Sequence, residues 1–242
     1  MSGVPAEAIR PDLSAALATA WAALGAPGTW WTGAERVAIA AETRQAASCP
    51  LCADRRQALS PYSVAGDHSN LGRLPAAAIE AIHRITTDAG RLSESWYRRV
   101  INGGLGEGPY VELLSVVAIV TCVDTFHRTL GLPARDLPPA RPGVPSCVVP
   151  AGAKPGLGWM PMLSPEDRRP DDPDLYRNRI GGNVQRALSL VPPAMIQFWD
   201  MFEAMYLENP AMRDFGREYR AISHPQIEML AARVATLNQC LY

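Results

Sequence analysis

The sequence predicts an all-α protein, and three features of the 242-residue chain lead to this prediction. Alanine is abundant, apolar residues recur at the three- and four-residue spacing of helices, and no run of alternating β-branched residues indicates a strand. Hydrophobic residues make up 48% of the chain and charged residues 19%. A sizeable core can therefore be buried, and a disordered chain is excluded.

Six helices are expected from this periodicity, and a seventh begins near Ser223 and runs toward the C-terminus. The clearest of them has Val111, Leu114 and Ala118 at helical spacing, and Gly131 follows it as a C-terminal cap. The expected ranges of the six are 12–25, 32–47, 75–87, 93–103, 108–131 and 183–207.

Charge and hydropathy argue against several classes of partner. The formal net charge is −1 and there is no long run of Lys or Arg, so neither nucleic acid nor a membrane surface is expected as a partner. The longest apolar stretch, Leu113 to Val123, is shorter than the ~20 residues of a membrane span and is interpreted as a buried helix. The N-terminal residues lack a signal-peptide pattern, and five cysteines do not form a disulfide scaffold, so a reducing cytoplasm is expected.

A proline-rich segment divides the chain. Eleven of the 22 prolines lie between Pro133 and Pro173, in a segment that also contains large apolar residues such as Trp159. A solvated spacer would not need those residues, so we expect an ordered strap over the helices, with a disordered tether as the alternative. The expected divisions are a first helical unit at 1–131, the connection at 132–176 and a second helical unit at 177–242.

An internal repeat relates the two ends of the chain. Aligning Cys49 with Cys240 superimposes the segment Thr32–Glu35 on the segment Ser223–Gln226. Both segments match the capping box, in which a hydroxyl residue caps a helix and an acid or amide three residues later reaches back. The alternative is two unrelated helices that end near a cysteine. Two capping boxes at the same distance from a cysteine favour a duplicated unit.

The second copy of the repeat stops where the first continues. The first copy contains Cys49 and Cys52, whereas the second ends at Tyr242, two residues after Cys240. The next position would complete a second Cys-x-x-Cys pair. Because selenocysteine is encoded by a codon otherwise read as stop, we expect a longer natural chain with selenocysteine at this place. The alternative is a genuine or artificial end at Tyr242.

These residues resemble the alkylhydroperoxidase D / carboxymuconolactone decarboxylase family, which is all-helical and carries the motif Glu-x(11)-Cys-x-x-Cys-x-x-x-His. Glu228 precedes Cys240 by the spacing that this motif requires. Segment 226–240 is similar to the motif helix of the family, and segment 110–118 is similar to another of its helices. The segment that begins at residue 183 is similar to the start of the family's second unit. The resemblance covers most of the chain except the proline-rich segment.

The sequence also departs from the family motif. In the first copy, Val37 stands at the Glu position and Arg56 at the His position. In the second copy, the second Cys and the His lie beyond Tyr242. Neither copy therefore contains the complete proton relay that the family uses.

The resemblance implies chemistry in which a thiolate attacks a peroxide O–O bond and a neighbouring thiol resolves the product as a disulfide. The candidate residues are Cys240, Glu228, Cys49 and Cys52. A helix N-terminus would lower the pKa of a thiol at such a site. Glu228 cannot serve Cys240 directly along one straight helix, because twelve residues span ~18 Å.

Several residues leave alternatives open. Cys49 and Cys52 could form a disulfide, bind a metal or be vestigial. A zinc site needs four ligands, and only His68 is nearby in sequence, so no metal and no other cofactor is expected. His127 is a further candidate because Asp124 could orient its imidazole at i, i+3; an ordinary surface contact is the alternative.

The expected function is therefore a thiol-dependent, or selenol-dependent, peroxidase that acts on a small hydroperoxide with a separate thiol or disulfide reductant. One alternative is a lyase like carboxymuconolactone decarboxylase, which needs acid–base groups and an anion pocket rather than a thiol pair. The other is a non-catalytic helical scaffold, which Val37 and Arg56 favour. The family resemblance also implies a homo-oligomer.

Overall fold

The computed structural model describes residues 9–156, 158–176, 179, 181–238 and 240. Within these residues the protein is all-α, and the one β contact is an isolated bridge between Lys154 and Met162. The helices of the described chain are α1 (Pro11–Ala23), α2 (Gly33–Ala46), α3 (Pro50–Gln57), α4 (Ala76–Asp88), α5 (Glu94–Val100), α6 (Glu107–Thr129), α7 (Asn183–Arg186), α8 (Pro192–Met205) and α9 (His224–Leu237).

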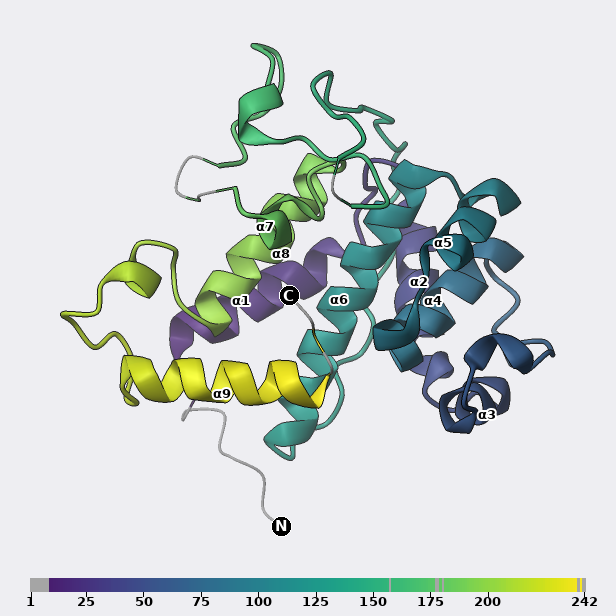
Figure 1. Cartoon of the computed structure of the whole chain (residues 1–242), viewed down its shortest axis with the longest axis horizontal. Coiled ribbons are helices and arrows are strands. Elements are labelled where there is room, and N and C mark those ends of the chain that lie inside the picture. Colours follow the sequence, from purple (N-terminus) through teal and green to yellow (C-terminus); the bar gives the residue numbers. More distant parts are fainter. Residues whose placement is uncertain (1–8, 157, 177–178, 180, 239, 241–242) are drawn as a thin grey trace.

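Helix α6 runs through the middle of the molecule, with α2 and α4 packed on one side and α1 and α8 on the other (Figure 1). Apolar residues cover most of its circumference, so it is buried from several directions at once. Among the described helices, α6 alone is long and apolar enough to span a membrane, and 56% of its most apolar window is buried inside the molecule.

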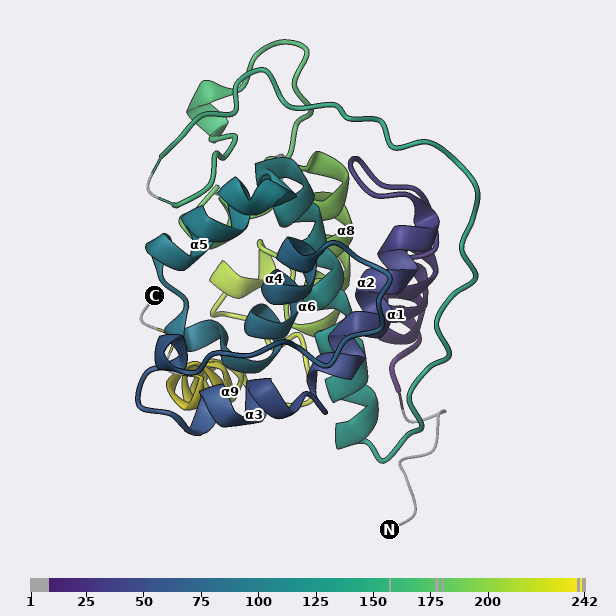
Figure 2. The same ribbon diagram turned by 90° about the vertical axis from the view of Figure 1, so that its right-hand side faces the viewer.

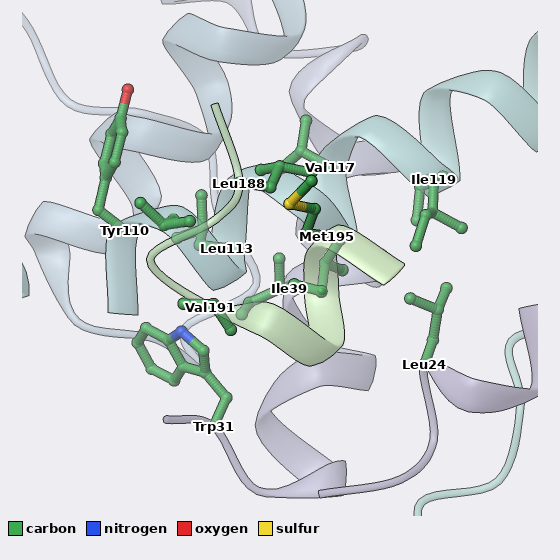
Figure 3. Close-up of a cluster of buried hydrophobic side chains, with 14 of the residues drawn as sticks. Leu24, Trp31, Ile39, Tyr110, Leu113, Val117, Ile119, Leu188, Val191 and Met195 are labelled. Carbon is green, nitrogen blue, oxygen red and sulfur yellow. The ribbon is translucent and has the colours of Figure 1, made fainter. Parts of the chain in front are cut away.

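The main core joins the two halves of the sequence. In Figure 3, Ile39 of α2, Val117 of α6 and Met195 of α8 lie in one cluster with Leu188 and Val191. Each of these side chains is buried, so α8 completes the same core that α2 and α6 begin. Burying a side chain of this size contributes about 1.5–3 kcal/mol to folding.

Helix α2 begins with the capping box expected from the sequence. The Glu35 backbone N–H donates to the Thr32 hydroxyl at 3.2 Å, and the Thr32 backbone N–H donates to the Glu35 carboxylate at 2.8 Å. The helix ends at Ala46, and Cys49 caps the short helix α3, with Pro50 at the first helical position. Helix α3 packs against α4, which brings the cysteine segment close to that helix.

The proline-rich segment lies across the outside of the helices. Figure 2 shows it leaving the end of α6, following α1 and α2, and passing over the top of the molecule. The Trp21 indole N–H donates to the Asp136 carbonyl at 2.8 Å, and the Arg141 N–H donates to the Gly25 carbonyl at 2.7 Å. Farther along, Leu163 is completely buried in the main core.

Two helices differ from the sequence prediction. The helix expected at 183–207 is broken into α7 and α8 by a turn that ends at Val191. Pro192 and Pro193 lack the backbone N–H that a continuous helix would need, so they begin α8 instead. The helix expected at 93–103 is α5 followed by a π turn at Ile101–Leu105, where Gly104 adopts a φ of +103°.

Helix α9 lies at the periphery of the molecule (Figure 1). Only His224 and Ile227 of this helix are buried, whereas Met229 and Leu230 are exposed. The Ser223 backbone N–H donates to the Gln226 side chain at 2.8 Å, which is the backward contact of the expected capping box.

Candidate functional site

Four segments converge around the Cys49 and Cys52 side chains: the end of α2, the start of α3, the loop between α3 and α4, and α4 itself. Cys49 and Cys52 are 2% and 3% exposed, and neither is in a disulfide. Because Cys49 caps α3 and Cys52 lies in its first turn, both thiols sit at the positive end of this helix. Their sulfur atoms lie within 4.8 Å of each other.

The first partner of these thiols is His83 of α4. Its Nδ1 lies 3.2 Å from the Cys52 Sγ, and its Nε2–H donates to the Glu42 carboxylate at 2.9 Å. Both His83 and Glu42 are completely buried. The second carboxylate oxygen of Glu42 accepts the Leu71 backbone N–H at 3.0 Å, so Glu42 ties α2 to the loop as well as to α4.

The second partner is His68, which the loop places on the other side of the thiols. Its Nδ1 lies 3.6 Å from the Cys49 Sγ and 3.5 Å from the Cys52 Sγ. Its Nε2–H donates to Glu80 at 2.8 Å. Glu80 also accepts hydrogen bonds from the Trp96 indole at 2.8 Å and from Arg55 at 3.0 Å, which hold its carboxylate in place.

These contacts set opposite protonation states for the two imidazoles. Burial lowers the pKa of His68, but its bonds to Cys52, Glu80 and Cys49 outweigh burial and raise that pKa to about 10. Burial lowers the pKa of His83, and the nearby His68 charge lowers it further against the pull of Glu42. At neutral pH, His68 is therefore a cation and His83 a neutral imidazole.

The thiol and the carboxylate next to His68 also shift. Burial raises the pKa of Cys49, but the backbone N–H of Cys52, His68 and the backbone N–H of Ser69 together hold this pKa below its ordinary value. Burial likewise opposes ionisation of Glu80, yet its bonds to His68, Trp96 and Arg55 lower its pKa to about 2. The site therefore favours an ionised thiol beside an imidazolium.

A cavity of about 410 Å³ lies between the cysteine segment and α6. Cys49 and Cys52 form part of its wall, and Arg44, Arg56 and Arg128 also line it. Arg44 is held by Asp124 through two hydrogen bonds of 2.7 and 2.8 Å. A small molecule in this cavity would therefore lie against Cys49 and Cys52 in basic surroundings.

The other candidates from the sequence lie outside this cluster. His127 bonds to the Pro133 carbonyl at 2.7 Å and accepts from Arg135, and its expected partner Asp124 is engaged by Arg44 instead. Cys240 is exposed near the end of the described chain.

Glu228 is on the peripheral helix α9, where it accepts a hydrogen bond from the Tyr206 hydroxyl at 2.7 Å. Helix α9 is unbroken to Leu237, so Glu228 stays about 14 Å along the helix axis from that residue. The position at which a selenocysteine is expected follows Tyr242 and lies outside the described residues.

His68 is the one of these partners that the sequence brings near the thiols, whereas His83, Glu42 and Glu80 are not predicted from it. The expectation of no zinc rests on the lack of a fourth ligand nearby in sequence, and the fold brings His83 close as a fourth possible ligand. The available signal was that the chain has only four histidines and that two of them follow the Cys-x-x-Cys pair within 31 residues. Glu42 and Glu80 carried no such signal, because acidic residues on helices are usually solvated.

Comparison of the chain with models of known protein families, with curated proteins and with solved structures finds no match. The assignment of function therefore depends on the geometry of this cluster.

Proposed function

We propose that the protein is a dithiol oxidoreductase that reduces a hydroperoxide at Cys49 and Cys52. The observation that carries this proposal is the contact of two buried thiols with two separate histidine–carboxylate pairs beside an open cavity. A thiol needs a proton acceptor to become a nucleophile, and a peroxide needs a proton donor for the departing oxygen. The neutral His83, paired with Glu42, can accept a proton, and the cationic His68, paired with Glu80, can donate one.

In the first step, the Cys49 sulfur attacks one oxygen of the hydroperoxide. Backbone N–H groups of Cys52 and Ser69 face this sulfur and favour its anionic form. The S–O bond forms as the O–O bond breaks, and the departing alkoxide takes a proton from His68, which Glu80 orients. The products are a sulfenic acid at Cys49 and an alcohol.

In the second step, Cys52 resolves the sulfenic acid. His83 Nδ1 accepts the Cys52 thiol proton, and Glu42 stabilises the imidazolium that results. The Cys52 sulfur attacks the Cys49 sulfur, and the S–O bond breaks as the S–S bond forms. The departing hydroxide takes the proton back from the His83 imidazolium and leaves as water. Two thiols and one hydroperoxide thus give one disulfide, one alcohol and one water. An external thiol reductant then restores the dithiol.

This relay differs from the one that the family motif would supply. Val37 and Arg56 occupy the motif positions in the first copy, and in the structure His83 contacts Cys52 instead, with Glu42 behind the imidazole. A dithiol that must be reduced after every cycle suits a reducing compartment, so we propose the cytoplasm. The non-catalytic scaffold explains neither the cavity against the thiols nor the paired relays.

We also propose that α2 and α9 are equivalent helices of a duplicated alkylhydroperoxidase-like unit. Both helices contain 14 residues, and both begin with a capping contact. The two capping contacts lie at the same distance in sequence before Cys49 and Cys240. Their surroundings differ, because α2 is buried in the core while α9 is largely exposed. The duplication is therefore supported by the local structure of the helices.

The test is the oxidation of chelator-treated protein with one equivalent of hydrogen peroxide. Mass spectrometry is expected to show loss of two hydrogens in the peptide that spans Cys49 and Cys52. With Cys52→Ser, a sulfenic acid should accumulate at Cys49 and react with a dimedone probe, while Cys147→Ser should behave as the wild type. Oxidation of the exposed Cys147 ahead of this pair, or only intermolecular disulfides, would contradict the proposal.

A further inference from the structure

The four side chains that face one another in this cluster also form a complete set of metal ligands. The two Sγ atoms and the two Nδ1 atoms of Cys49, Cys52, His68 and His83 all lie within 4.8 Å of one another. The sulfur-to-nitrogen distances are 3.2, 3.5 and 3.6 Å. Tetrahedral zinc, with bonds of ~2.3 Å to sulfur and ~2.0–2.1 Å to nitrogen, has sulfur-to-nitrogen edges of about 3.5 Å.

The surrounding hydrogen bonds orient both histidines as metal binding requires. His83 directs Nε2–H to Glu42 and His68 directs Nε2–H to Glu80, so in each ring Nδ1 faces the sulfurs. A carboxylate behind each ligating histidine is the usual arrangement in zinc sites, where it fixes the ring and strengthens the ligand. The sulfur and nitrogen donors themselves select zinc over magnesium or calcium, which prefer oxygen.

The position of the site in the fold also suits a metal ion. Its ligands come from the start of α3, the following loop and α4, in the pattern Cys-x₂-Cys-x₁₅-His-x₁₄-His. The small cluster around Cys49 and Cys52 contains only Leu51 as a further buried apolar side chain. A metal ion would therefore hold together a corner of the molecule that has little hydrophobic core of its own.

We propose that Cys49, Cys52, His68 and His83 bind one Zn²⁺ when both thiols are reduced, and that Glu42 and Glu80 support the two histidine ligands. Zinc binding does not depend on the redox reaction, whereas its release on oxidation rests on the proposed function. Oxidation of the zinc-bound pair by hydrogen peroxide and two protons gives one disulfide, free Zn²⁺ and two waters. The metal thus protects the thiols until a peroxide removes two electrons from them.

Zinc is measured first in the reduced full chain. After removal of metal with a chelator under reducing, oxygen-free conditions, titration with Zn²⁺ against a chromophoric chelator is expected to show one tight site per chain. Cobalt should give the intense visible bands of a tetrahedral site and a thiolate charge-transfer band. Cys49→Ser and His83→Gln should abolish the tight site, and Glu42→Gln should weaken it about 10–100-fold. Cys147→Ser is the control and should bind as the wild type does.

The cobalt spectrum is read on the unaltered chain, so the proposal stays testable even where a variant fails to fold. A six-coordinate cobalt spectrum without the thiolate band, or zinc binding that survives Cys49→Ser, would overturn the metal site. Addition of hydrogen peroxide to the zinc-bound protein should then release one zinc per disulfide formed. Tight zinc binding without release on oxidation would contradict only the proposed link between disulfide formation and zinc release. Disulfide formation in a chain that binds no zinc would contradict only the proposed metal site.

Discussion

His83 and Glu42 form a completely buried hydrogen-bonded pair, with 2.9 Å between the His83 Nε2 and the Glu42 carboxylate. The pair joins α2 to α4 and presents the opposite ring nitrogen to Cys52. No water is available at this buried position to replace a lost partner of the Glu42 carboxylate, so breaking its hydrogen bond to His83 would be costly. The pair therefore holds α2 against α4 and also fixes the His83 ring for the proposed chemistry.

Replacing Glu42 with glutamine tests this contribution. The amide keeps the size of the side chain but removes the charge that accepts the His83 N–H. Hydrogen bonds to charged groups contribute about 1.5–3 kcal/mol, and we expect the free energy of unfolding of the metal-free protein to fall by about that amount in urea titrations. The matched control is Glu94→Gln, an exposed partner of Arg98, which should change stability by less than about 0.5 kcal/mol. Equal effects of the two changes would contradict the prediction.

The buried pair of Arg36 and Glu112 leads to a second prediction. These side chains approach to 3.5 Å between α2 and α6, and Glu112 also accepts the Trp30 backbone N–H. A Cβ atom added at Gly28 would lie 1.6 Å from a Glu112 carboxylate oxygen, so Gly28→Ala must displace that carboxylate. Disrupting a buried ion pair costs about 3–5 kcal/mol, which thermal unfolding should record as a large loss of stability.

Gly103→Ala is the control for this change, because a Cβ atom there has its nearest neighbour at 3.8 Å. Little or no loss of stability is expected for it. If Gly28→Ala unfolds at the wild-type temperature, the close approach of Gly28 to Glu112 does not constrain the fold.

A single carboxylate organises part of the proline-rich segment. Asp172 accepts backbone N–H groups from Ala151 at 2.6 Å, Gly152 at 2.9 Å and Arg169 at 2.9 Å. These donors, foremost that of Arg169, hold the pKa of Asp172 below its ordinary value against the effect of burial. Its contribution to stability is therefore fully present above the unfolded-state pKa and is lost as the pH falls through the folded-state pKa.

Asp172→Asn is accordingly expected to destabilise the protein at pH 6, and this effect should shrink steadily as the pH is lowered toward pH 2. The readout is the urea midpoint as a function of pH, with limited proteolysis at pH 6 to locate the loosened segment around residues 151–172. The exposed neighbour Asp171 supplies the control, since Asp171→Asn should leave both readouts unchanged. A difference between Asp172→Asn and the wild type that stays constant across this pH range would refute the linkage.

The sequence predicted the helical class and most helix positions because the apolar periodicity is strong where helices face a core. It failed at Val191, where the main break between α7 and α8 depends on the following prolines rather than on periodicity. It could not predict that His83, 31 residues after Cys52, packs against that cysteine, because this contact depends on how α3 docks on α4. A contact between residues on two different helices leaves no short-range pattern in the sequence from which it could be predicted.

The candidate residues divide in the same way. Cys49 and Cys52 can be recognised from the sequence because Cys-x-x-Cys is a local spacing, here at a helix start. The spacing of His127 to Asp124 predicts a pair between them, but a long-range partner, Arg44, binds that carboxylate instead. A helical i, i+3 pair competes with every other charged group that the fold brings near, and the sequence alone does not identify those competitors.

The cavity between the cysteine segment and α6 gives a prediction about the substrate. Arg56 and Arg128 line it and are exposed, and neither forms an ion pair within the described part of the chain. A hydroperoxide that carries a carboxylate should therefore bind better than its methyl ester. We expect Arg56→Gln to raise the KM for the acid roughly two- to fivefold, the effect of an exposed ion pair, and to leave the KM for the ester unchanged.

The comparison is made in steady-state assays with a dithiol reductant, at low salt and again at high salt, where screening should remove most of the difference between acid and ester. Arg98, which is exposed on α5 and paired with Glu94, provides the control variant Arg98→Gln. An increase in KM that is equal for acid and ester would mean that Arg56 shapes the cavity rather than attracting charge. In that case His68 and the backbone N–H groups of Cys52 and Ser69 would still favour the ionised sulfur of Cys49, but the cavity arginines would not select the substrate by charge.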